Sequence, residues 1–180
     1  ALWIRVIQDF DVCEQNSREV LPPRYFLEDK NTPSRCQNAW VSQMLRAITF
    51  VAPDFKAPYV VGAPILSVLV DDRDGAKDIY DRGLKRFPDD KTIHFYAAYH
   101  YMFEILDNKR AAELLIEAGK LGAPQWVFST AARLMEKGGE KEFALKIIRD
   151  TLARNPDQYL RERLLRKLQL IESSKEIRAK

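Results

Sequence analysis

The chain has 180 residues, of which 46% are hydrophobic, and this is enough for one compact domain with a substantial core. Acidic and basic residues nearly balance, at a net charge of +3, which argues against a nucleic-acid-binding surface. No run of about 18 apolar residues is present, so no transmembrane segment is predicted.

The chain opens on the apolar sequence ALWIRVI rather than on Met, which suggests a processed or trimmed product and leaves a leader or anchor upstream as an open alternative. The localisation is open between the cytoplasm and the cell envelope, where a segment before Ala1 would anchor a periplasmic protein. Residues 1–12 are predicted to form a helix with Trp3, Ile7 and Phe10 on one face.

A long loop is predicted over residues 13–36, because several prolines interrupt any helix there. A loop of this length inside a compact domain is often functional. Cys13 and Cys36, the only cysteines, bracket it. Two interpretations are open. The cysteines form a disulfide worth roughly 3 kcal/mol in an exported protein, which we slightly favour, or they are separate buried thiols in a reducing cytosol.

From about residue 39 onward the sequence repeats itself. Ala76 in GAKDIYDRGLKRFPDD corresponds to Ala144 in EFALKIIRDTLARNPDQ, 68 residues later, which is twice 34. A large residue, a small residue and a proline follow each of these alanines at matching spacings. Between them, RAAELLIEAGKLGAP carries another copy at Ala111, and QMLRAITFVAPDF upstream carries the tail of a fourth.

This pattern resembles the tetratricopeptide repeat (TPR), and the resemblance covers about residues 39–156. The chain is also similar to small bacterial TPR proteins. The resemblance implies an all-α fold, a right-handed superhelix of antiparallel helix pairs (a TPR-like solenoid of about three to four repeats) in one domain over 1–180. The implied units are an atypical first unit at 1–56, repeats at 57–90, 91–124 and 125–156, a capping helix at 157–174 and a frayed tail at 175–180.

Small residues recur where the two helices of each unit would approach closely, and turn residues recur between those helices. Turns are predicted at 71–75, 107–108 and 138–139.

Pro64 falls inside a predicted helix, which should therefore kink or start late. An irregular helical bundle that mimics the period by chance is the alternative. The small residues of the repeats occupy three equivalent positions: Pro64, Ala98 and Ala132 at the first, Ala76, Ala111 and Ala144 at the second, and Gly83, Ala118 and Thr151 at the third.

The C-terminal segment 157–174 is predicted to cap the stack, because repeat arrays need a last helix with one apolar and one polar face. Its apolar positions are Leu160, Leu164, Leu168 and Ile171. A basic patch for nucleic acid or anionic lipid is the alternative use of Arg161, Arg163, Arg166 and Lys167. Interleaved glutamates favour an ordinary solvated face instead.

The stretch KTIHFYAAYHYMFEIL, residues 91–106, is predicted to be the first helix of the middle repeat. Its histidines, His94 and His100, are six residues apart, whereas helical metal ligands are spaced by three or four. We therefore predict no metal site. His94 is interpreted as a hydrogen-bonded core residue, and His100 is placed near the back surface.

The TPR resemblance implies a concave groove for a partner protein. The places where carboxylate-binding TPR domains carry lysine and asparagine are apolar here, for example Val61 and Phe95, which argues against a carboxylate clamp. An amphipathic helix or an apolar peptide fits better. The groove is either open, or covered from within the chain by the N-terminal helix, the long loop or the C-terminal cap, or used as a homo-oligomer contact. The predicted groove residues are Val61, Ile65, Leu69, Phe95, Tyr99, Phe103, Trp126, Ser129 and Arg133.

Motifs for catalysis, such as GxSxG, GxxxxGK[ST] and HExxH, are absent from the sequence, and neither an enzymatic activity nor a cofactor is predicted. The first functional hypothesis is a non-enzymatic scaffold or adaptor that serves assembly or regulation of a larger bacterial complex. The second is a structural module of a membrane-tethered or oligomeric complex, with the groove filled internally.

Overall fold

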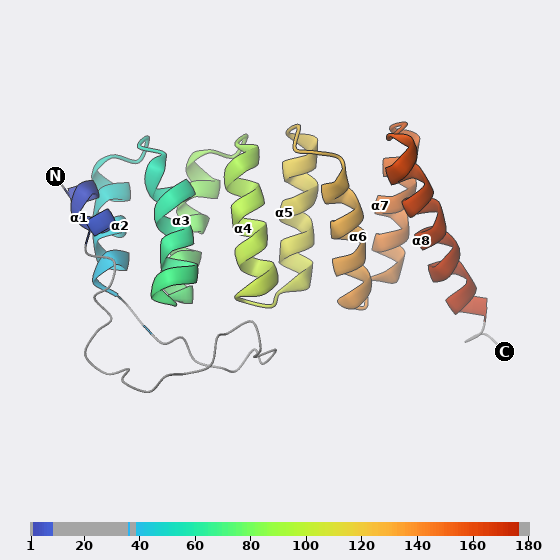
Figure 1. The fold of residues 1–180 in the computed structure, drawn as a ribbon, viewed down its shortest axis with the longest axis horizontal. Helices are drawn as coiled ribbons and strands as arrows, with labels where there is room; N and C mark the ends of the chain where they lie inside the picture. Colours follow the sequence, from blue (N-terminus) through green and yellow to red (C-terminus); the bar gives the residue numbers. More distant parts are fainter. Residues whose placement is uncertain (1, 9–35, 37–38, 177–180) are drawn as a thin grey trace.

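The structure is a computed structural model that describes residues 2–8, 36 and 39–176. Every regular element in this part of the chain is a helix, as the all-α prediction requires (Figure 1). Two of these helices, η2 and η3, are π-helical. In chain order the helices are α1 (Leu2–Gln8), α2 (Trp40–Val51), η2 (Pro58–Gly62), η3 (Ile65–Val70), α3 (Arg73–Arg86), α4 (Lys91–Phe103), α5 (Asn108–Lys120), α6 (Trp126–Lys137), α7 (Lys141–Ala153) and α8 (Gln158–Glu176).

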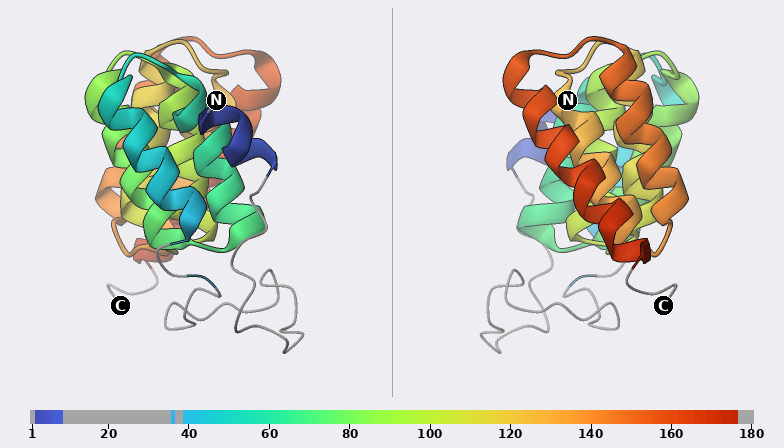
Figure 2. Two further views of the ribbon diagram at one scale, coloured as in Figure 1. Left: turned by 90° about the vertical axis from the view of Figure 1, so that its left-hand side faces the viewer. Right: turned by 90° about the vertical axis from the view of Figure 1, so that its right-hand side faces the viewer.

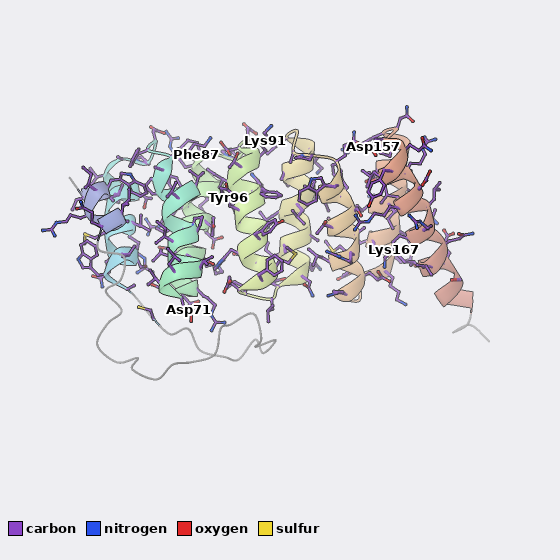
Figure 3. All side chains as sticks on the ribbon, in the orientation of Figure 1. Asp71, Phe87, Lys91, Tyr96, Asp157 and Lys167 are labelled. Carbon is purple, nitrogen blue, oxygen red and sulfur yellow. The ribbon has the colours of Figure 1, made fainter. Side chains whose placement is uncertain are left out.

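The helices lie side by side in chain order along the long axis of the molecule, from α1 and α2 at one end to α8 at the other (Figure 1). Each packs mainly against its neighbours in the sequence, for example α5 against α4 and α6. Seen from either end, successive helices overlap, so the molecule is an elongated row (Figure 2). Neighbouring helices alternate in direction: Phe87 and Lys91 lie at one edge of the row, and Asp71 lies at the other (Figure 3).

Aspartate side chains begin three consecutive helices. Asp72, Asp90 and Asp107 accept hydrogen bonds from backbone N–H groups in the first turns of α3, α4 and α5. These bonds satisfy donors that a helix start leaves unpaired. Between α6 and α7 the chain turns at Gly139, whose φ of +85° is a conformation that glycine adopts without strain. The aspartates and glycines of the predicted turns thus set where the helices begin and end.

Pro64 changes the geometry of its helix rather than its starting point. Helical turns run from Pro58 to Val70, so of the two predicted alternatives, a kink or a late start, the late start does not occur. The hydrogen bonds widen instead to the π pattern, as in the bond from Ala63 N–H to the carbonyl of Pro58. A wider turn accommodates a proline because the ring lacks an N–H and would collide with the carbonyl four residues earlier in an α-helix.

The small residues that recur with the repeat lie in the helix contacts. Ala98 and Ala132 are completely buried, as are Ala76, Ala111, Ala144 and Ala118. At Gly83, an added Cβ would lie 2.9 Å from the ring of Tyr59 and 3.2 Å from the side chain of Ile93. The backbones of neighbouring helices therefore approach most closely where the side chains are smallest. Pro64, at the same repeat position as Ala98, is only partly buried.

We expect Ala98→Leu to destabilise the protein by about 1–3 kcal/mol, because three extra carbons must enter a site with no exposed surface. Urea unfolding measures this. Ala153→Leu is the control, because Ala153 is exposed at the end of α7, and the change there should fall within about 0.5 kcal/mol. Equal effects of the two substitutions would contradict the close-approach argument.

The N-terminal helix is described over residues 2–8, and the rest of its predicted range lies outside the described residues. Helix α1 packs on α2 with Val6 fully buried. Trp3 makes an edge-on contact with Phe55, with 5.5 Å between the ring centroids. Ile7 is exposed and Trp3 is partly buried, so the face on which both were predicted is only partly covered. The third member of that face, Phe10, lies outside the described residues.

The structure describes one of the two cysteines. The side chain of Cys36 is buried and disulfide-bonded, and its backbone N–H donates to the carbonyl of Asp71 at 3.4 Å. Cys13 lies outside the described residues, as does most of the predicted loop 13–36. The pairing of the two cysteines therefore stays a prediction.

Helix α8 covers the end of the row. Leu160, Leu164 and Ile171 are buried and Leu168 is partly buried, which are the apolar positions predicted for the cap. Lys167 forms an ion pair with Glu136 of α6, and Arg161 donates to Asn155. Two of the four cations of the suggested basic patch thus have partners within the protein. None of the described helices combines the length and hydropathy that crossing a membrane requires.

Candidate partner-binding surface

Helix α4 has one buried and one open side. Ile93, Ala97 and Ala98 have no exposed surface, because α3 and η2 pack on one flank of α4 and α5 on the other. Phe95, Tyr99 and Phe103 follow one another at intervals of four residues. Since an α-helix has about 3.6 residues per turn, this spacing keeps the three rings on one side.

Four aromatic residues form a continuous surface that we call the aromatic stripe: Phe95, Tyr99, Phe103 and Trp126. Along α4, the ring centroids of Phe95 and Tyr99 are 4.9 Å apart, and those of Tyr99 and Phe103 are 5.5 Å apart. The ring of Trp126, at the start of α6, meets Phe95 edge-on at 5.7 Å. Contacts at these distances fix ring positions and join the open sides of α4 and α6.

The aromatic stripe faces outward. Phe103 is 60% exposed, Trp126 41% and Tyr99 39%, while Phe95 is partly buried against the core. Three of the predicted groove residues in this set are therefore open to solvent in the structure. Helices α1 and α8, two of the elements suggested as internal covers, lie at the two ends of the row (Figure 1). The third suggested cover, residues 13–35, lies outside the described part of the chain.

The remaining predicted groove residues lie on both sides of the stripe. Val61 and Leu69 are exposed on η2 and η3, and Ile65 is partly buried. On α6, Ser129 is partly buried and Arg133 is exposed. The predicted surface is therefore apolar on η2, η3 and α4, and it becomes polar on α6.

The two histidines have different environments from each other. Nδ1 of His94 lies 2.9 Å from the carbonyl oxygen of Asp90, which confirms the hydrogen-bonded core histidine. His100 is also buried, so its predicted place near the back surface is wrong. Its Nδ1 lies 2.7 Å from Oγ of Ser67, and its ring packs on Tyr80, because η3 and α3 enclose that side of α4. Among the described residues, no cluster of His, Cys, Asp and Glu could hold a metal ion.

A surface cavity of about 540 Å³ lies between α3, α4 and α5, and no sequence pattern indicated it. Two pairs of its lining side chains interact: the Tyr101 hydroxyl donates to Asp81 at 3.1 Å, and Arg110 pairs with Glu113 at 3.2 Å. Burial raises the pKa of Tyr101, so its hydroxyl keeps the proton that it donates. Because its walls come from three helices, the cavity is visible only in the folded structure.

Asp90 fixes the start of α4 and thereby the position of the aromatic stripe. Its Oδ1 accepts from the N–H groups of Thr92 at 2.9 Å and Ile93 at 3.1 Å, and Oδ2 pairs with Lys56. Burial opposes ionisation of this carboxyl group. The hydrogen bonds from Lys56, Ile93 and Thr92 outweigh that effect and hold the pKa of Asp90 below its ordinary value of 3.8.

We expect Asp90→Asn to cost about 1 kcal/mol at pH 7, where the ionised carboxylate caps the helix and pairs with Lys56. Because the pKa of Asp90 is lower in the folded state than in the unfolded state, the ionised carboxylate stabilises the folded protein at pH values above the unfolded-state pKa. This stabilisation is lost as the pH falls through the folded-state pKa. The difference from wild type should therefore narrow below about pH 4. Urea unfolding at a series of pH values measures this, with Asp89→Asn at the exposed neighbouring position as control. A difference that is constant down to pH 2 would contradict the expectation.

Comparison of this chain with protein-family models, curated proteins and solved structures finds no match. The aromatic stripe and the repeated helix packing are therefore the observations from which a function can be argued.

Proposed function

We propose that this protein is a non-enzymatic scaffold or adaptor that binds an apolar segment of another protein on its aromatic stripe. Such binding would serve the assembly or regulation of a larger complex. The observation that carries the proposal is the stripe itself: rings at 4.9–5.7 Å from one another that stay exposed on two helices. Contiguous exposed aromatic surface is typical of protein-binding sites.

We also propose that the helix row is a TPR-like right-handed superhelix in which the stripe lies on the concave side. The burial pattern supports this. Ile93, Ala97 and Ala98 of α4 have the same zero exposure as the residues 34 positions later in α6, namely Val127, Ala131 and Ala132. A constant offset between equivalent buried positions is expected when identical units stack.

An amphipathic helix or an extended apolar peptide is the partner that fits best. The rings of the stripe follow one helix at single-turn intervals, which matches apolar anchors repeated along a bound segment. Large aromatic side chains also provide most of the binding energy in protein interfaces, because they bury much surface at little entropic cost. A carboxylate-clamp ligand is not proposed, since Phe95 and Tyr99 hold the positions that would have to be polar.

Affinity selection tests this function. A displayed library of segments of about 16 residues, long enough for several helical turns, is selected on the wild-type protein and counter-selected on a Phe95→Ala, Tyr99→Ala variant. The expected result is enrichment of segments with apolar residues at intervals of three or four that bind only the wild type. Failure to enrich any segment, or enrichment of segments that bind the variant equally well, would speak against the stripe.

A structural module of an oligomeric complex is the second candidate, and the end of α2 favours it. Phe50 is 81% exposed and Val51 79%, and both lie on α2, whereas the stripe lies on α4 and α6. Sedimentation velocity over a range of concentrations distinguishes the two. A dimer that Phe50→Ser with Val51→Ser dissociates would support this candidate, and a monomer at all concentrations would contradict it.

A further inference from the structure

Resting on the proposed function, we infer that the bound segment is acidic next to its apolar anchors, and that Arg133 and Lys137 hold its carboxylates. Both cations lie on α6, which is joined to the aromatic stripe through Trp126. The inference concerns the chemistry of the partner, which the aromatic rings alone leave open.

Arg133 and Lys137 lie on the same side of α6 as the stripe. They follow Trp126 by 7 and 11 residues, and at about 100° per residue both positions return to within roughly 20° of the tryptophan. On α4, the residue 34 positions before Trp126 is Thr92. Tyr99 follows Thr92 by the same 7 residues, and Phe103 follows it by the same 11. Where α4 carries Tyr99 and Phe103, α6 therefore carries Arg133 and Lys137.

Both cations are exposed, and neither forms an ion pair with any of the described residues. The acid closest to them in sequence, Glu136, is taken by Lys167 of α8. Helix α4 contributes no acidic residue between Lys91 and Phe103. On the described helices α4 and α6, the open surface thus passes from aromatic rings to positive charge, and the one acidic residue of these two helices, Glu136, is already paired.

A partner that covers the aromatic stripe would extend over these cations and exclude water from them. An acidic residue at that place gains an ion pair in a medium of reduced dielectric constant, whereas a lysine there would meet like charge. Opposite charge beside apolar anchors therefore selects the partner and its orientation, while the rings supply the affinity.

The test uses synthetic amphipathic peptides of about 16 residues with one apolar face. One carries glutamates after the apolar block, one carries them before it, and matched versions carry glutamine or lysine at the same places. Fluorescence anisotropy gives the affinity of each for the whole protein. We expect one of the two glutamate peptides to bind roughly tenfold tighter than its glutamine version, and the lysine version to bind weakest. High salt should reduce this preference, because the screening length shortens.

Variants assign the preference to the two cations. Arg133→Gln with Lys137→Gln should remove the difference in affinity between the glutamate and glutamine peptides. Lys146→Gln is the matched control, since Lys146 is an exposed cation on α7 that lines a separate cavity between α5, α6 and α7. This control should keep the full preference. A preference that survives in the double variant would overturn the inference.

Other outcomes separate this inference from the proposed function. If the glutamate, glutamine and lysine peptides bind equally, and Phe95→Ala with Tyr99→Ala abolishes binding, the charge inference fails and the aromatic binding surface stands. If the glutamate peptides bind equally well to that aromatic variant, the contact is purely ionic and the stripe is not the binding surface. If no peptide binds the wild type, both the inference and the proposed function fail.

Discussion

Replacing both Phe95 and Tyr99 by alanine is expected to reduce affinity for a selected segment by about 100-fold or more while leaving the protein folded. The two rings are neighbours at 4.9 Å in the middle of the stripe, between Trp126 and Phe103. Central aromatic side chains of an interface cost about 2 kcal/mol or more each when truncated, and two such losses exceed 100-fold in the dissociation constant.

The cost in stability should be much smaller than the cost in binding. Tyr99 is 39% exposed and Phe95 is only partly buried, so the double variant should lose about 1–2 kcal/mol in urea unfolding. If the rings were instead covered within the protein, each truncation would cost about 3–5 kcal/mol, as in a core. Measuring affinity and unfolding on the same samples separates the two possibilities.

Tyr159→Ala is the control for this variant. Tyr159 is 70% exposed on α8, away from the stripe, and its removal should change neither binding nor stability measurably. A loss of binding in the control as large as in the double variant would show that exposed aromatic residues in general, and not the stripe, capture the segment.

Asp72→Ala is expected to destabilise the protein by about 3 kcal/mol, the largest effect of any single substitution proposed for a polar group. The carboxylate has no exposed surface, and it accepts from the N–H of Gly75 at 2.9 Å and from that of Ala39 at 3.0 Å. Alanine would leave two buried donors without partners, and each such loss costs about 1–3 kcal/mol.

Asp107→Ala is the matched comparison for Asp72→Ala. Asp107 also begins a helix and accepts from the N–H of the residue three places later, but it is only partly buried and has no distant donor among the described residues. Its replacement should cost about 1 kcal/mol, the usual effect of a lost helix cap. Urea unfolding of both variants tests this, and equal losses would mean that the bond to Ala39, 33 residues away, adds nothing.

Local patterns in the sequence predicted the helical class, the apolar positions of α8 and the buried small residues. Each of these depends on neighbours in the chain. Leu160, Leu164 and Ile171 recur at helical spacing, so one face of a helix must be apolar. Ala98 and Ala132 are equivalent in the repeat, and residues with short side chains allow close helix contact wherever the partner helix comes from.

Other features depended on groups that are distant in the sequence. His100 looked like a surface residue from its place on α4, yet Ser67 and Tyr80 enclose it. Helix α1 buries Val6 where it docks on α2, although Val6 is not a member of the predicted apolar face. Periodicity gives the relative angle between residues of one helix, whereas the direction of the buried face is set by which helices pack on it.

The sequence by itself determined which residues form helices, where aspartate and glycine separate them, and that Phe95, Tyr99 and Phe103 share one side of a helix. Only the tertiary structure decided that the ring of Trp126 in α6 meets Phe95 and so joins the rings of two helices into one surface. The reason is that helical spacing is fixed by backbone geometry over a few residues, while the contact of one helix with another depends on how all their side chains pack together.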